Sequence, residues 1–182
     1  MRILCPRLAL PATLATLAAV TGCIPQPPTV PAPARQPMAT PPAPAPVARP
    51  ALAPDWRDWP MTAGTWVYRQ DARGSIALFG PANAAALVTM RCDSAARRIS
   101  IARAGTNTGA MTIRTTSTSR VLPVQSTGGT PAYVAAALDA RDPLLEAIGF
   151  SRGRFTIEQA GAAPLVIPPW AEVERVTQDC RG

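Results

Sequence analysis

The sequence predicts a mainly β fold, an antiparallel sandwich or partly open barrel with one short helix and a C-terminal helix. Three observations predict it. Several short segments between residues 66 and 158 alternate apolar and polar side chains, as strands do when one face meets water. Asp142 and Pro143 can open a short helix that Gly149 closes. Residues 170–180 have the spacing of an amphipathic helix.

The strands follow in chain order. Residues 66–70 and 75–79 flank a short turn, in which Gly74 supplies the positive φ that such connections often need. The later alternating or apolar segments are residues 87–92, 98–102, 111–116, 154–158 and 165–167. Residues 119–125 form a weaker strand that Pro123 interrupts. Residues 132–140 stay open, because their alanines suit a helix and Tyr133-Val134 suits a strand.

Two cysteines fall on predicted inward faces. Cys92 shares a strand face with Val88 and Met90, and Cys180 shares a helix face with Val173 and Val176. We predict a structural disulfide between Cys92 and Cys180, which would fasten the last helix to the sheet. The alternative is a redox-active pair, but such thiols usually lie close in sequence as CxxC.

The N-terminus predicts export. Residues 1–22 have the pattern of a signal peptide, with Arg2 and Arg7 before an apolar stretch from residue 8 to residue 20. These thirteen residues suit a signal sequence, whereas a membrane-spanning helix needs about 20.

The segment Val20-Thr21-Gly22-Cys23 resembles the lipobox of bacterial lipoproteins. The resemblance implies cleavage before Cys23, a diacylglycerol thioether on that cysteine and an acyl chain such as palmitate on the new N-terminus, which together anchor a protein firmly. The alternative is an ordinary secreted protein in which Cys23 is incidental. Ile24 stands where inner-membrane lipoproteins often carry Asp, which favours the outer membrane, facing the periplasm.

After the signal peptide, the sequence predicts a tether and then one domain. Residues 23–54 comprise the cysteine and a stretch with twelve prolines in 31 residues, which predicts an extended, disordered spacer that could reach about 95 Å. Composition changes at Asp55, and residues 55–182 form the predicted β domain.

The residue content excludes several classes of catalytic site and metal site. The chain has no histidine and no lysine, which rules out Ser-His-Asp and Cys-His hydrolases, histidine-ligated zinc sites, Schiff-base chemistry and P-loops. We therefore expect no catalytic residue, no metal and no cofactor. Paired carboxylates survive this argument, so a glycan hydrolase stays a minor alternative.

Three groups of residues suggest binding. Trp56, Trp59 and Trp66 form either a ligand platform or, as we favour, the edge of the core. Residues 151–154 form either a small anion site or an ordinary loop. Outward arginines could bind peptidoglycan or lipopolysaccharide, and the candidates are Arg91, Arg103, Arg114 and Arg154.

Segments 148–155, 165–170 and 176–181 resemble the C-terminal part of an uncharacterised family of alphaproteobacterial envelope lipoproteins. With residues 66–92, the likeness covers most of residues 56–181 and implies no known activity. The order of strands, late helix and closing cysteine is also similar to the β-sandwich of invasion-associated locus B-like proteins.

The function we expect is that of a non-catalytic, lipid-anchored envelope protein, a binding or structural module whose partner is another envelope protein or peptidoglycan. The alternative is a lipocalin-like ligand-binding or inhibitor domain. Nucleic acid is excluded as a partner because the protein is expected outside the cytoplasm.

Overall fold

The computed structural model describes residues 51–182. The predicted signal peptide, Cys23 and nearly all of the proline-rich spacer lie outside the described residues. No helix of the described part is long and apolar enough to cross a membrane.

The larger of two sheets has six antiparallel strands in the order β1-β2-β3-β4-β8-β7. The strands are β1 (Thr65–Asp71), β2 (Gly74–Gly80), β3 (Val88–Asp93), β4 (Arg98–Ala104), β8 (Tyr133–Asp139) and β7 (Gln125–Ser126). The segment at residues 132–140, left open by its sequence, is thus a strand, and it pairs along its whole length with β4.

The smaller sheet has four antiparallel strands in the order β10-β9-β5-β6. They are β10 (Leu165–Ile167), β9 (Phe155–Gln159), β5 (Met111–Arg114) and β6 (Ser119–Leu122). Pro123 lies between β6 and β7, where the chain passes from one sheet to the other. Proline cannot donate to a strand ladder, so it ends the pairing at this point. The two sheets are open and neither closes into a barrel, which confirms the predicted mainly β, sandwich-like fold.

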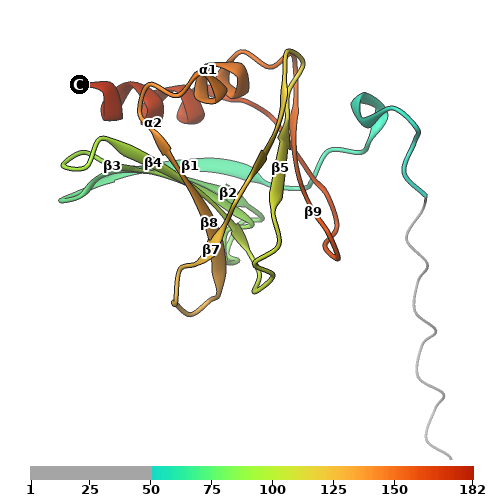
Figure 1. The fold of residues 1–182 in the computed structure, drawn as a ribbon, viewed down its shortest axis with the longest axis horizontal. Helices are drawn as coiled ribbons and strands as arrows, with labels where there is room; N and C mark the ends of the chain where they lie inside the picture. The colour runs from blue at the N-terminus through green and yellow to red at the C-terminus, as the bar shows by residue number, and fades with distance from the viewer. Residues whose placement is uncertain (1–50) are drawn as a thin grey trace, which may run out of the picture. The chain divides into compact units, whose positions relative to one another are not determined.

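Two helices complete the core (Figure 1). In α1 (Pro143–Gly149), the Asp142 carboxylate accepts the Leu144 N–H at 2.8 Å, as predicted for a cap. The longer α2 (Ala171–Arg181) packs on α1 and on β1 to β4. Apolar side chains from both sheets and both helices fill one continuous core; its largest fully buried members include Phe79, Met90, Ile101, Ile113, Leu145, Ile148, Phe155 and Ile157.

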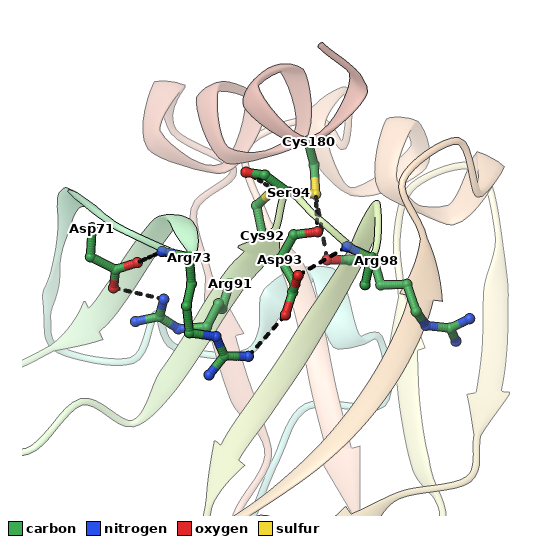
Figure 2. A network of polar contacts seen from close by, with 9 residues as sticks. Asp71, Arg73, Arg91, Cys92, Asp93, Ser94, Arg98 and Cys180 are labelled. Carbon is green, nitrogen blue, oxygen red and sulfur yellow. Dashed lines mark hydrogen bonds and ion pairs between the residues drawn. A yellow bond between two sulfur atoms is a disulfide. The ribbon is translucent and has the colours of Figure 1, made fainter.

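A disulfide joins Cys92 of β3 to Cys180 of α2, as predicted (Figure 2). The two residues are 88 positions apart in sequence, and their Cα atoms are 5.4 Å apart. Both side chains are almost fully buried. The bond therefore fastens the last helix to the middle of the larger sheet, away from solvent.

Candidate functional site

The outer face of the smaller sheet carries an ion pair between neighbouring strands. Alternation along β5 and β9 turns Ile113 and Ile157 into the core, and Arg114 and Glu158 to the opposite face. Arg114 donates to both carboxylate oxygens of Glu158, from Nε at 3.0 Å and from Nη2 at 3.3 Å. This fork geometry fixes both side chains. The Thr156 hydroxyl donates to the same carboxylate at 2.8 Å.

The chain that leads into β1 packs over this face. It contains a short 3-10 helix, η1 (Trp56–Asp58), followed by Trp59. The Trp59 indole N–H donates to the Ala53 carbonyl at 2.7 Å, and the Trp59 carbonyl accepts from Arg154 Nη1 at 2.7 Å. These bonds hold Trp59 from both its side chain and its main chain. Among the described residues, the contacts of the domain thus include Ala53, just before the predicted boundary at residue 55.

Trp59 lines two hollows at the surface. One has a volume of about 450 Å³ and the other of about 610 Å³, and Trp59 and Glu158 line both. We call the two hollows together the Trp59 groove. The first is lined by Leu52, Ala110, Thr112 and Gln159 among others, and the second by Pro54, Asp55, Trp56, Arg57 and Arg114.

The second hollow contains balanced charges. Asp55 pairs with Arg57 at 3.4 Å, and Glu158 pairs with Arg114 at 3.0 Å. Arg57 also lies over the ring of Trp56, 5.0 Å from its centroid. Two carboxylates and two guanidinium groups give this part of the groove no net charge.

A third hollow, of about 650 Å³, lies on the outer face of the larger sheet. Its floor consists mainly of small side chains, among them Thr89, Ser100, Ala102 and Ala135. Arginines stand at one end of it, where Arg91 pairs with Asp71 at 2.8 Å and Arg73 with Asp93 at 3.1 Å (Figure 2).

The carboxylates of this arginine network are stabilised in their charged form. The hydrogen bond from Arg91 lowers the pKa of Asp71, and the Ala96 N–H, followed by Arg73, lowers the pKa of Asp93. A general acid needs the opposite shift, so these carboxylates suit a structural role at neutral pH.

The tryptophans do not form one platform. Trp66 is 5% exposed, and its indole N–H donates to the Pro168 carbonyl inside the core. Trp56 is 7% exposed beneath Arg57. Trp59 remains half-buried at the surface, where it lines both hollows. The core-edge interpretation is therefore confirmed for Trp66 and for the largely buried Trp56, which borders only the second hollow, whereas Trp59 lines both.

One arginine prediction is wrong. Arg103 is 5% exposed and points inward, where it donates to the carbonyls of Ile157 and Ala163 in place of a ligand. Burial lowers its pKa. Of the other candidates, Arg91 and Arg114 are paired with carboxylates, and Arg154 supports Trp59. Residues 151–154 form a loop in which buried Ser151 donates to the Arg154 carbonyl at 2.5 Å.

The pairing of Arg114 with Glu158 was not predicted from sequence. Both belong to alternating segments and point outward, but 44 residues separate them, and only the pairing of β5 with β9 brings them together. Within residues 51–182, no three cysteine or acidic side chains are grouped closely enough to hold a metal ion.

No protein-family model, no curated protein and no solved structure matches the chain. The resemblance to alphaproteobacterial envelope lipoproteins and to invasion-associated locus B-like proteins therefore stays a prediction.

Proposed function

We propose that the chain is a lipid-anchored, non-catalytic protein of the bacterial cell envelope, whose β domain binds another envelope component. The anchor is inferred from the lipobox-like Val20-Thr21-Gly22-Cys23, and the spacer from the prolines after it. The outer membrane, facing the periplasm, is the location that Ile24 favours.

One observation supports the binding role most. The Trp59 groove combines a half-buried aromatic side chain at the surface with polar groups that are already held in place by hydrogen bonds. Preformed hollows with a few fixed polar groups are typical of binding sites. Both acidic residues that line the groove are in ion pairs with arginines, an arrangement that favours binding over proton transfer.

Lipidation and location can be tested together. The full-length protein, expressed in a Gram-negative host with labelled palmitate, should carry the label and sediment with outer membranes. Cys23→Ser should abolish both, whereas the matched variant Cys5→Ser, within the signal peptide, should retain both. Label or membrane association that survives Cys23→Ser would contradict the anchor. Crosslinking in intact cells, followed by identification of the crosslinked component, would then identify the partner.

A glycan hydrolase is the second candidate, because Asp55 and Glu158 line the same hollow. Glycosidases use two carboxylates on either side of the scissile bond. Incubation of the purified protein with peptidoglycan should release no new reducing ends if the proposal is right. Release that disappears in both Asp55→Asn and Glu158→Gln would replace it with the hydrolase.

A lipocalin-like module is less favoured. Such a domain surrounds its ligand with a closed barrel, whereas the described strands form two open sheets around a core of packed side chains.

A further inference from the structure

We propose that the Trp59 groove binds a neutral saccharide chain, with one or more sugar rings in each of the two hollows that Trp59 lines. This inference goes beyond the proposed function because it names a ligand class, and it concerns residues 51–182 alone. It holds whether or not Cys23 carries lipid.

The first argument is the charge of the groove. Asp55 with Arg57 and Glu158 with Arg114 form two neutral pairs in one hollow. An anionic or cationic ligand would gain attraction from one member of each pair and repulsion from the other. A neutral ligand with many hydroxyl groups can instead donate to the carboxylates and accept from the guanidinium groups.

The second argument is the exposure of the ion pair between Arg114 and Glu158, which lines the second hollow. The Arg114 side chain is 38% exposed and the Glu158 side chain 24% exposed, although each binds the other. Each side chain therefore keeps surface that a ligand can reach. Because the fork between them is already formed, a ligand would not have to order them, which reduces the entropic cost of binding.

The third argument is the position of Trp59. The faces of aromatic rings carry partial negative charge, which attracts the weakly positive C–H groups on the faces of sugar rings. Hydrogen bonds from the indole to Ala53 and from Arg154 to the main chain hold Trp59 in place. The ring is thus fixed beside the polar pair at Arg114 and Glu158.

The fourth argument is size. The hollows of about 450 and 610 Å³ each fall in the range of about 300–1,000 Å³ that small-molecule sites occupy. Because Trp59 and Glu158 line both, a chain of sugars that occupies both hollows can contact the same two side chains with more than one of its rings. We therefore expect a tetrasaccharide to bind more tightly than a single sugar.

Calorimetric titration of the full-length protein in detergent tests the proposal, with chitotetraose, cellotetraose and free N-acetylglucosamine as probes. Saturable binding of either tetrasaccharide, tighter than that of N-acetylglucosamine, is the expected result. Trp59→Ala and Glu158→Gln should each weaken it by about tenfold or more, which corresponds to at least about 1.4 kcal/mol. The matched control is Trp170→Ala, since Trp170 is 47% exposed and lies outside the groove.

The use of two different variants keeps the binding test informative even if one of them loosens the fold. Glu158→Gln preserves the size of the side chain, so it remains informative if Trp59→Ala loosens the entry segment, as judged by its unfolding midpoint. Binding should persist at about 1 M salt, where the screening length is about 3 Å. Loss of binding in high salt would overturn the neutral-ligand argument.

Two further results would also overturn the proposal: no saturable binding of either tetrasaccharide at millimolar concentration, or binding that both Trp59→Ala and Glu158→Gln leave unchanged. Failure of the anchor is a separate matter, because it would appear as Cys23-independent membrane association. Cleavage of a bound tetrasaccharide would support this site and contradict only the non-catalytic part of the proposed function.

Discussion

Arg103 Nη1 donates a hydrogen bond of 3.0 Å to the main-chain carbonyl of Ile157, and this bond joins the two sheets. Arg103 belongs to β4 of the larger sheet, and Ile157 to β9 of the smaller one. Nη2 of the same guanidinium donates to the Ala163 carbonyl, just before β10. A buried cation thus donates to two main-chain carbonyls, one within β9 and one in the chain that leads into β10.

Arg103→Met should destabilise the domain by about 1–3 kcal/mol, because buried carbonyls that lose their donor carry a desolvation cost. Chemical unfolding followed by tryptophan fluorescence measures the change. The matched control is Arg98→Met on the same strand, where the side chain is exposed, and its effect should stay within about 0.5 kcal/mol. Equal unfolding midpoints for the two variants would show that the bond between the sheets contributes nothing.

The double variant Cys92→Ala/Cys180→Ala should lose up to about 4.5 kcal/mol of stability, because the disulfide closes a loop across 88 positions. Hydrogen exchange should rise first in α2, which the bond fastens to β3. A reductant should lower the unfolding midpoint of the native protein and leave the midpoint of the double variant unchanged. Unaltered exchange in α2 after loss of the bond would contradict the fastening role.

Asp142→Asn should make the domain less sensitive to acid. Burial raises the pKa of Asp142, but the Arg120 guanidinium, at 2.8 and 2.7 Å, and the Leu144 N–H outweigh it, and the pKa is lowered from 3.8. A lowered pKa means that the stabilisation is complete above about pH 4 and is lost as pH falls through the folded-state value. Near neutral pH, the variant should be less stable by about 1–2 kcal/mol.

Unfolding midpoints of wild type and Asp142→Asn, measured from neutral pH down to about pH 2, should therefore converge at the acid end. Asp139→Asn, at an exposed position on the preceding strand, serves as the control. A difference between wild type and Asp142→Asn that persists unchanged at the lowest pH would rule out the ion pair with Arg120 as its source.

Stability should be flat between about pH 5 and pH 9. The chain contains no histidine and no lysine, and the two cysteines of the domain are bonded to each other. Burial, followed by the hydrogen bond to Asp179, raises the pKa of Tyr68 above 10.0, and burial raises that of Tyr133. Raised tyrosine pKa values stabilise the fold below about pH 10, and this contribution disappears as pH rises through the folded-state values.

Phenolate absorbance should consequently appear later in the folded than in the unfolded protein, and Tyr68→Phe and Tyr133→Phe should each remove part of the delayed signal. Urea unfolding midpoints across the same pH series test the plateau. A clear slope between pH 5 and pH 9 would contradict this prediction, because it would require a carboxyl group whose pKa is raised into that range in the folded domain.

Local sequence signals predicted most of the elements, because their physical causes are local. The cap at Asp142, Pro143 in the first turn and the alternation of β2 to β5 each depend on a few neighbouring residues. Residues 132–140 could not be assigned this way. Their helix and strand preferences nearly cancel, and pairing with β4 decides between them.

The candidate site was less predictable, because its contacts are between distant segments. Alternation along the strand puts Arg103 on the same face as Ile99 and Ile101, but the charge of its side chain suggested that it faces solvent. Its burial is explained by the hydrogen bonds that it donates to the carbonyls of Ile157 and Ala163. Glu158 alone gives no sign of a site. The groove requires Trp59, almost a hundred residues earlier, to lie over the same sheet.

The way the chain enters the domain has a mechanical consequence. Trp59 is held by Arg154, and Thr62 exchanges hydrogen bonds with Val166 of β10, donating from N–H at 2.9 Å and accepting at its hydroxyl at 2.9 Å. A pull on the chain at Ala51 would load these bonds before it reached β1 or the disulfide-linked helix. The segment that carries Trp59, which lines both hollows, would detach from the domain first. A pull on the chain at Ala51 would therefore open the groove before it unfolded the core. Mechanical load on the entry segment and an intact groove thus depend on the same few hydrogen bonds.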